Sequence, residues 1–297
     1  MKIFVTGASG FIGSAFCRAA IERGHRLLAL GRSGTAASMA QIEIAPGDLA
    51  NTPWSQVKQF APDAALHLAW IATPGSYLES AENAVWLDQS KAWFGRLFDL
   101  GVPYVAGTGT CIEYAASASA LNEELSQRNP LFPYSRAKAA LFEWLQEARV
   151  AAPSAWSWFR VFYPYGPGEH PSRLTTTLIQ QLRAGRGVDL RTPQSVKDYI
   201  FVDDVAQAMC EAMEARMPGA INVGTGQGIS IRELASRIAQ LMGAHPALVR
   251  PAAELACDPT PNVIADNQRL QSLGWRPRTS LDAGLQRLIS SLSDASR

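Results

Sequence analysis

The feature that most constrains the fold is a glycine-rich turn between an apolar strand and a helix at the N-terminus. Residues 3–5 (Ile-Phe-Val) are typical of a buried strand, and residues 11–23 carry apolar side chains at helical spacing. Between these segments stand Gly7, Gly10 and Gly13. Glycine there permits a tight turn, a close approach of backbone N–H groups to phosphate and close packing of helix on strand. The pattern predicts a dinucleotide site at the start of the helix, with a ligand-free glycine turn as the alternative.

Strand and helix patterns alternate through the first half of the chain. Short apolar runs are each followed by a segment with helical periodicity, which is typical of a parallel sheet covered on both faces. After the first pair, strands are expected at 27–30, 64–68, 104–106 and 156–161, and helices at 77–100 and 134–150. We therefore predict an α/β fold with a Rossmann-type, doubly wound parallel sheet.

The second half of the chain predicts a smaller α/β lobe. Proline and glycine interrupt residues 164–171, and the elements that follow are shorter. Helices are expected at 174–184, 203–214, 230–242 and 281–293, with strand-like runs at 198–201 and 220–222. We predict a dinucleotide-binding domain over 1–162 and a mainly substrate-binding C-terminal lobe over 163–297, with segments near 197–224 able to return to the first domain.

Composition excludes several classes of function. The chain has 297 residues, of which 47% are hydrophobic, so it can bury a large core and is not a disordered protein. A net charge of +1 gives no general attraction to nucleic acid or to acidic membranes. Neither a membrane span, an export signal nor a metal-ligand spacing is found in the sequence. We expect a cytoplasmic protein with no metal, no nucleic acid and no membrane as partner.

A tyrosine and a lysine lie one helical turn apart at the start of a predicted helix. Tyr134 and Lys138 share one face of the helix over 134–150. An ammonium near a phenol lowers the tyrosine pKa, which suits proton exchange with a substrate hydroxyl near neutral pH. Lysine also has three donors with which it can hold ribose hydroxyls. The pair is a candidate acid/base unit, and a chance pair on a helix is the alternative.

The glycine motif Thr6-Gly-Ala-Ser-Gly-Phe-Ile-Gly13 resembles the signature of the extended short-chain dehydrogenases/reductases, the NAD-dependent epimerase/dehydratase family. The Tyr134/Lys138 pair and the segments 159–168 and 197–205 are similar to other motifs of that family. The resemblance extends to residues 273–277 and points to the nucleotide-sugar branch. It implies a Rossmann-type fold, a nicotinamide cofactor and a nucleotide-sugar substrate.

The resemblance also implies roles for individual residues. The family carries a catalytic hydroxyl four residues before a tyrosine, which assigns this role to Thr110 ahead of Tyr114, with Thr108 as the competing candidate. The catalytic residues are then Thr110, Tyr134 and Lys138. The residues expected to bind the cofactor are Gly7, Gly10, Phe11, Ile12, Gly13, Arg32, Asp48, Leu49, Leu68, Ala69, Tyr134, Lys138 and Phe162. Those expected to bind the substrate are Trp70, Thr110, Cys111, Tyr163, Arg173 and Lys197.

Several of these residues have a second reading. No acidic residue follows the second strand to accept hydrogen bonds from a ribose 2′-hydroxyl, whereas Arg32 could pair with a 2′-phosphate or simply face solvent. We therefore favour NADP(H) over NAD(H). Asp48 is placed near the adenine by the resemblance, or else it is a turn aspartate. Arg173 and Lys197 are candidate diphosphate ligands or solvated charges.

The residues after Thr110 discriminate between the reactions of the family. Dehydratases of the family carry Asp-Glu there, whereas this chain has Cys111 and Ile112, with Glu113 expected to point elsewhere from a strand. The string Gly-Thr-Cys-Ile-Glu-Tyr resembles reductases of nucleotide-linked 4-keto-6-deoxyhexoses. We expect an NAD(P)H-dependent reductase of such a sugar, with Tyr134 as the acid/base. The alternatives are a nucleotide-sugar 4-epimerase with tightly bound NAD and, in another class, a non-catalytic dinucleotide-binding regulator.

Three further positions and the assembly complete the expectations. His67 ends a predicted strand and is read as a structural histidine, Trp70 replaces the alanine that the family has there, and Asn83 resembles the family's helix asparagine. The family often dimerises through the helices expected at 77–100 and 134–150, and we expect a homodimer. Core packing would equally explain their apolar residues, which are Trp93, Leu97, Leu100, Leu141, Trp144 and Leu145.

Overall fold

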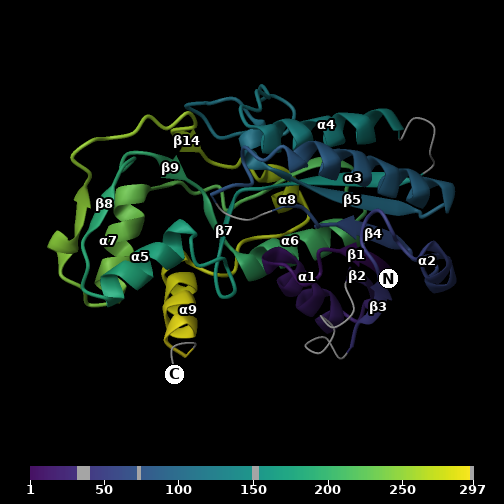
Figure 1. Cartoon of the computed structure of the whole chain (residues 1–297), viewed down its shortest axis with the longest axis horizontal. Helices are drawn as coiled ribbons and strands as arrows, with labels where there is room; N and C mark the ends of the chain where they lie inside the picture. The colour runs from purple at the N-terminus through teal and green to yellow at the C-terminus, as the bar shows by residue number, and fades with distance from the viewer. Residues whose placement is uncertain (32–40, 72–74, 149–153, 295–297) are drawn as a thin grey trace.

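A parallel sheet of seven strands forms the centre of the N-terminal part of the protein (Figure 1). The structure is a computed structural model that describes residues 1–31, 41–71, 75–148 and 154–294. The strand order is β11-β6-β5-β4-β1-β2-β3. The strands are β1 (Lys2–Thr6), β2 (Arg26–Gly31), β3 (Glu43–Pro46), β4 (Ala64–His67), β5 (Tyr104–Thr110), β6 (Ala155–Val161) and β11 (Gly219–Val223).

Helices cover both faces of this sheet because alternate strand residues point to opposite sides. Ile3 and Val5 pack in a cluster with residues of α1 and α6, whereas Phe4 packs in a second cluster with residues of α3 and α4. The helices are α1 (Phe11–Glu22) and α6 (Val202–Glu214) on the first face and α2 (Trp54–Phe60), α3 (Glu82–Asp99) and α4 (Pro133–Ala148) on the second. The predicted doubly wound α/β fold is confirmed.

The C-terminal elements form a smaller lobe around a core of their own, seen at the left of Figure 1. Its helices are α5 (Leu174–Arg183), α7 (Ile231–Leu241), α9 (Leu281–Asp294) and the 3₁₀ helix η3 (Pro246–Leu248), with α8 (Gln268–Ser272) against the sheet. Small sheets pair β7 (Tyr163–Tyr165) with β10 (Tyr199–Phe201) and β8 (Val188–Leu190) with β13 (Val249–Pro251). A third joins β9 (Val196–Lys197) to β12 (Ile229–Ser230) and β14 (Asn262–Val263).

The chain returns to the N-terminal sheet after first entering the lobe. Strand β11 pairs in parallel with β6 at the sheet edge, and α6 packs against α1. Arg23, the C-cap residue that follows α1, donates to Gln207, Glu211 and Glu214 of α6. The first hydrophobic cluster therefore contains residues from both sides of position 162. The domain boundaries themselves stay a prediction.

Some elements differ from their expected bounds. The helix expected from residue 77 begins only at Glu82, because residues 75–79 form turns and Gly75 has a left-handed backbone (φ +86°). Asn83 stabilises that turn by donating to the carbonyl groups of Tyr77 and Ser80. β3 and α2 had no clear signal because both are short. Their apolar residues match neither pattern over enough positions to identify them.

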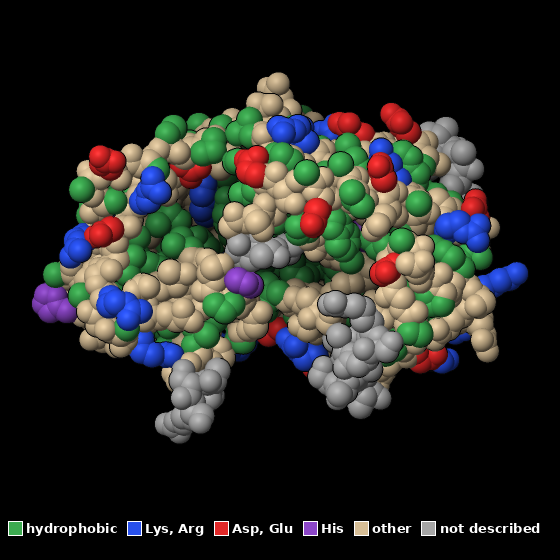
Figure 2. All heavy atoms as spheres, viewed as in Figure 1, with side chains coloured by type: hydrophobic (Ala, Val, Ile, Leu, Met, Phe, Trp, Pro, Cys, Tyr) green, Lys and Arg blue, Asp and Glu red, His purple; other side chains and the backbone are tan. Residues whose placement is uncertain are grey.

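Surface features bear on partners. Figure 2 shows acidic and basic side chains interspersed on one face, together with a hollow lined by hydrophobic side chains on the side of the C-terminal lobe. Within the ranges that the structure describes, no helix has the length and hydropathy of a membrane span. Of the apolar residues noted for dimerisation, Trp93, Leu97, Leu141 and Leu145 are buried in the protein's own core, so they do not argue for a dimer. The homodimer stays a prediction.

Candidate active site

The glycine turn brings the end of β1, the start of α1 and the end of β4 into close contact. Gly7 has a left-handed backbone (φ +72°), and a Cβ atom there would lie 2.6 Å from the backbone nitrogen of Ala69. A Cβ at Gly13 would overlap the carbonyl oxygen of Gly7. Larger side chains would therefore push α1 away from the sheet. This explains physically why glycine occupies both positions.

The start of α1 has the features of a phosphate site. Its N-cap residue is Gly10, and no side chain caps the helix. The first N–H groups of a helix have no partner within it, and the helix dipole favours an anion there. Gly10 is exposed, and Phe11 and Ile12 are half-buried. The residues present thus fit the pyrophosphate of a dinucleotide, with small side chains leaving the backbone accessible.

The other expected cofactor residues are placed as follows. Leu68 and Ala69 follow β4, and the backbone nitrogen of Ala69 donates to the Thr6 hydroxyl (3.2 Å). Asp48 accepts from the backbone and side chain of Asn51, which is the geometry of a turn aspartate. The side chain of Leu49 is buried in the second core cluster. Arg32 lies outside the described residues.

A cavity of about 370 Å³ lies at the carboxyl end of the sheet, between the sheet and the C-terminal lobe. The ends of β5 and β6 and the first turns of α4 line it, so it occupies the edge of an α/β sheet where ligands bind. It brings together ten of the expected residues, namely Ile12, Leu68, Trp70, Thr110, Cys111, Tyr134, Lys138, Phe162, Tyr163 and Arg173. The expected residues that do not line it are Gly7, Gly10, Phe11, Gly13, Asp48, Leu49, Ala69 and Lys197.

Lys138 is held firmly on the floor of this cavity. Its side chain is 2% exposed, and its ammonium donates to the carbonyl oxygen of Thr108 (2.8 Å). The ammonium also lies 3.8 Å from the centre of the Trp70 ring, a cation–π contact. Burial lowers the pKa of Lys138 to about 7, and the nearby charge of Glu113 opposes this shift. The lysine therefore titrates near neutral pH.

Tyr134 does not have the lowered pKa that was expected. Burial raises its pKa, and the neighbouring Tyr77 and Glu113 raise it further, while Arg173 acts in the opposite direction. The reason is geometric, since the ammonium of Lys138 is 6.0 Å from the centre of the Tyr134 ring and is bonded to Thr108 instead. The phenol is therefore protonated at neutral pH.

Both Thr108 and Thr110 line the cavity, and Thr110 is the better candidate hydroxyl because Thr108 already donates its proton to a backbone carbonyl. Thr108 Oγ1 donates to the carbonyl oxygen of His67 (3.0 Å) and is 8% exposed. Thr110 ends β5 and begins a 3₁₀ turn, η2 (Cys111–Glu113). Glu113 was expected on a strand but lies in this turn, where it is fully buried. Cys111 lines the cavity, and burial raises the pKa of its thiol to about 12.

Trp70 and Asn83 are linked across the cavity wall. The indole N–H of Trp70 donates to the side-chain oxygen of Asn83 (2.9 Å), which is itself buried. Asn83 also fixes the turn that carries Tyr77, and the Tyr77 ring packs edge-on against Tyr134 at 4.9 Å between ring centres. Trp70 therefore both packs and shapes the cavity, and Asn83 orients the wall beside Tyr134.

Arg173 and Lys197 have different surroundings. Arg173 lines the cavity that holds Tyr134 and a neighbouring cavity of about 240 Å³, and its charge acts on the phenols of Tyr77 and Tyr134. Lys197 lines only the neighbouring cavity, is 6% exposed and pairs with Asp258 at 2.8 Å. It also donates to the carbonyl oxygen of Thr260. The charge of Lys197 is thus already balanced by a carboxylate.

His67 is a core residue, in agreement with the structural reading. It is fully buried, with Nδ1 2.7 Å from Thr6 Oγ1 and Nε2 2.9 Å from Ser90 Oγ. Ser90 donates its own proton to the Trp86 carbonyl, so Nε2 is the donor to Ser90 and Nδ1 accepts from Thr6. Burial and the charge of Lys138 hold the pKa of His67 well below its usual value. The ring is therefore neutral.

Sequence reasoning missed several residues of this cavity. Tyr77, Leu78 and Phe132 line it from turns beside the start of α4, and Asp258 lines it from the C-terminal part of the chain. The turn residues belong to no recurrent motif, and Asp258, Pro259 and Thr260 are distant in sequence from the other lining residues. The one sequence signal among them is the aromatic residue at position 77, which stands just before α3 (Glu82–Asp99).

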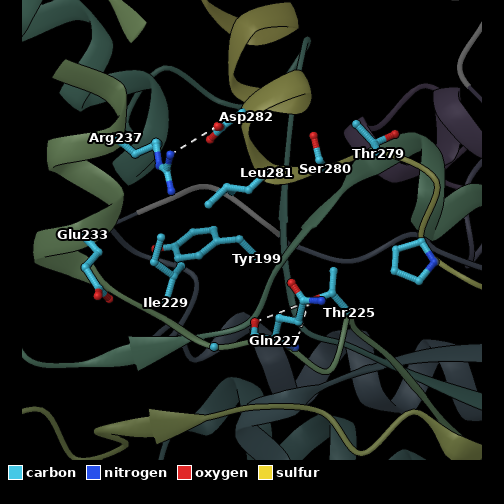
Figure 3. Close-up of a pocket in the computed structure, with 12 residues that line it drawn as sticks. Tyr199, Thr225, Gln227, Ile229, Glu233, Arg237, Thr279, Ser280, Leu281 and Asp282 are labelled. Carbon is cyan, nitrogen blue, oxygen red and sulfur yellow. Dashed lines mark hydrogen bonds and ion pairs between the residues drawn. The ribbon is translucent and has the colours of Figure 1, made fainter. Parts of the chain in front are cut away.

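A separate cavity of about 560 Å³ lies in the C-terminal lobe (Figure 3). Side chains from β10, the loop at 225–229, α7 and the start of α9 surround it, and Arg237 pairs with Asp282 across it at 3.3 Å. It contains none of Thr110, Tyr134 and Lys138. The chemistry expected from the sequence therefore belongs to the smaller cavity.

Comparisons with known proteins agree with this fold. The model of the NAD-dependent epimerase/dehydratase family matches residues 3–224. A UDP-glucose 4-epimerase of Halalkalibacterium halodurans is 26% identical over 308 residues, covering 94% of this chain and 91% of that protein. A 2-alkyl-3-oxoalkanoate reductase of Stenotrophomonas maltophilia is 28% identical over 342 residues, covering 98% and 99%. The crystal structure of UDP-glucose 4-epimerase from Thermotoga maritima with UDP-glucose superposes with a TM-score of 0.85 at 21% identity, covering 100% of both chains.

Proposed function

The chain belongs to the NAD-dependent epimerase/dehydratase family, and from this premise we propose that it is an NAD(P)H-dependent reductase of a nucleotide-linked 4-keto-6-deoxy sugar. The observation that carries the proposal is the convergence of Thr110, Tyr134 and Lys138 on one cavity beside the glycine turn. Relatives support the two parts of the proposal, which are the reduction and the nucleotide-sugar substrate. One is named for reduction of an oxoalkanoate and one for epimerisation at C4 of UDP-glucose.

The residues of the cavity have complementary tasks in this reaction. A bound nicotinamide would supply a hydride to the carbonyl carbon. The protonated phenol of Tyr134 donates its proton to the carbonyl oxygen, which becomes the hydroxyl of the product. The Thr110 hydroxyl donates a hydrogen bond to the same oxygen while negative charge develops on it. The ammonium of Lys138 would hold the ribose next to the nicotinamide through its remaining donors. The phenolate left on Tyr134 takes up a proton from solvent before the next turnover.

Elimination of water is disfavoured by the side chains around Thr110. A dehydratase needs an acid and a base beside the hydroxyl, whereas Cys111 and Ile112 stand there. Glu113 is turned into the core and pairs with Arg160. Among the described residues that line the cavity, the one carboxylate is Asp258, and it is paired with Lys197.

A nucleotide-sugar 4-epimerase with tightly bound NAD is the second candidate. It is favoured by the relatives named UDP-glucose 4-epimerase. Because an epimerase must also reduce its 4-keto intermediate, the protonated phenol of Tyr134 suits both candidates. We propose NADPH as the preferred reductant on the basis of Arg32.

The test supplies the purified protein with NADPH or NADH and a nucleotide-linked 4-keto-6-deoxyhexose. We expect stoichiometric loss of reduced-nicotinamide absorbance, and we expect Tyr134→Phe to lower kcat by about 10²- to 10⁴-fold with little change in dinucleotide affinity. A UDP-hexose and a 2-alkyl-3-oxoalkanoate serve as the comparison substrates. Interconversion of the UDP-hexose without net cofactor change would establish the epimerase, and full activity of Tyr134→Phe would refute both.

A further inference from the structure

A buried carboxylate, that of Glu113, accepts a hydrogen bond from the backbone of Thr110, the candidate catalytic hydroxyl residue. Glu113 is 0% exposed, and its Oε1 accepts from the backbone N–H of Thr110 (2.9 Å) and from Trp158 Nε1 (3.1 Å). Its Oε2 accepts from Arg160 Nε (2.8 Å). The hydroxyl of Thr110 accepts in turn from Ile112 N (3.5 Å), so the two ends of the 3₁₀ turn hold each other.

Two positions of β5, Gly107 and Gly109, carry no side chain on the face where this arrangement lies. A Cβ atom at Gly109 would overlap both Glu113 Oε1 and Trp158 Nε1, and one at Gly107 would lie 2.5 Å from the Trp158 ring. The Trp158 indole therefore occupies the space that side chains at positions 107 and 109 of β5 would fill. A serine at position 109 would not fit here without displacing the carboxylate.

The far side of the carboxylate is anchored in the sheet. Arg160 is fully buried on β6, and its second nitrogen donates to the Tyr114 hydroxyl (3.0 Å). That hydroxyl donates to Asn222 on β11 (2.7 Å). The carboxylate is thus tied to the neighbouring strands, and its position does not depend on solvent-exposed groups.

We propose that Glu113 is a positioning residue for the reaction, because its carboxylate, fixed by Arg160 and Trp158, holds the backbone of Thr110 so that the Thr110 side chain faces the cavity. This inference rests on the proposed function only for the role of Thr110. A hydroxyl that must meet a developing charge has to be fixed within a fraction of an ångström. A turn fastened by a buried charge provides that precision.

The charge of Glu113 has a second effect on the same cavity. The groups that face Lys138 are Glu113, His67 and Tyr134, and those that act on Tyr134 are Tyr77, Cys111, Arg173 and Glu113. Burial lowers the pKa of Lys138 and raises that of Tyr134, and Glu113 raises both. Removal of its charge therefore lowers both pKa values, whichever of the two groups the alkaline limb of the rate profile reports.

The first variant is Glu113→Gln, which keeps the shape and removes the charge. One acceptor oxygen then serves Thr110 and Arg160, so one of these donors loses its partner. We expect kcat to fall by about 10- to 100-fold with the KM for the ketone within a few-fold of wild type. We also expect the alkaline limb of kcat/KM to move to lower pH by roughly half a unit or more.

Asp204→Asn is the matched control, because Asp204 is also buried and accepts two backbone N–H groups at 278 and 279, away from the cavity. It should lower stability and leave both kcat and the limb unchanged.

The second variant, Gly109→Ala, displaces the carboxylate but keeps its charge. We expect a lower kcat with an unmoved alkaline limb, and this variant decides the matter if Glu113→Gln does not fold. Activity of Gly109→Ala and Glu113→Gln within two-fold of wild type, beside an inactive Tyr134→Phe, would overturn the inference and leave the proposed function intact. Should Tyr134→Phe be active, the proposed function fails, and amide hydrogen exchange at residues 110–112 still reports whether Glu113 holds the turn.

Discussion

At the scale of single residues, burial governs the chemistry of the cavity. Lys138 and Tyr134 were expected to act as a close ion pair, yet the lysine bonds a strand carbonyl and packs on Trp70. Both groups are therefore shifted towards their neutral forms, the lysine by losing a proton and the tyrosine by keeping one. Tyr134 is therefore a neutral phenol beside a lysine that titrates near neutral pH, and in the proposed reaction it carries the proton that it would donate.

This shift has a consequence for stability that a single substitution can measure. The pKa of Lys138 is about 7 in the folded protein and near its ordinary value when unfolded. Between those values the unfolded state binds the additional proton, so the free energy of unfolding rises with pH. Relative to Lys138→Met, wild type stripped of dinucleotide should gain roughly 1 kcal/mol per pH unit from pH 7.5 to 9 in urea unfolding. A pH-independent difference would mean that the buried lysine keeps its proton.

At the scale of elements, close approach of backbones defines the dinucleotide turn. α1 can start directly beneath β1 and beside β4 because positions 7 and 13 lack side chains. The same device recurs on β5, where glycines at 107 and 109 admit the Trp158 ring. Glycine thus stands at the positions near the cavity where another backbone or a large ring lies too close for a side chain.

A pair of glycine substitutions separates this packing role from helix propensity. Gly13→Ala places a methyl group against the Gly7 carbonyl and should cost about 1–3 kcal/mol in the free energy of unfolding, together with weaker dinucleotide binding. Gly95→Ala lies inside α3, where nothing stands within 4 Å of the added atom, and should stabilise by up to about 1 kcal/mol. Denaturant unfolding and dinucleotide titration measure both. Equal effects of the two changes would contradict the packing explanation.

At the scale of the whole molecule, the two ends of the chain complete one another. The parallel sheet lacks its edge strand without β11, and α1 is covered by α6 and by Arg23 contacts to Glu211 and Glu214. The cavity likewise takes Tyr163, Arg173 and Asp258 from the C-terminal part and Thr110 and Tyr134 from the N-terminal part. Neither part alone holds the candidate catalytic residues and the residues expected to bind substrate together.

The expected outcome for a divided chain follows from this arrangement. A fragment of residues 1–162 leaves the β6 edge unpaired and exposes the apolar face of α1, so it should not fold on its own. We expect an aggregated or unfolded fragment by circular dichroism, and recovery of folded material on co-expression with residues 163–297. A cooperative thermal transition of the isolated fragment would show that the returning segments contribute little.

Sequence alone determined the fold class, the glycine turn and the Tyr134/Lys138 pair, because these depend on local periodicity and short spacings. The resemblance to a family added Thr110 as a candidate. Tertiary structure decided the rest. The burial that sets the protonation of Lys138 and Tyr134, the neutralisation of Lys197 by Asp258 and the anchoring of Glu113 by Trp158 and Arg160 all arise between segments distant in the chain. No local pattern records which distant side chain will supply a partner or exclude water, and the free energy of a charge depends on exactly that.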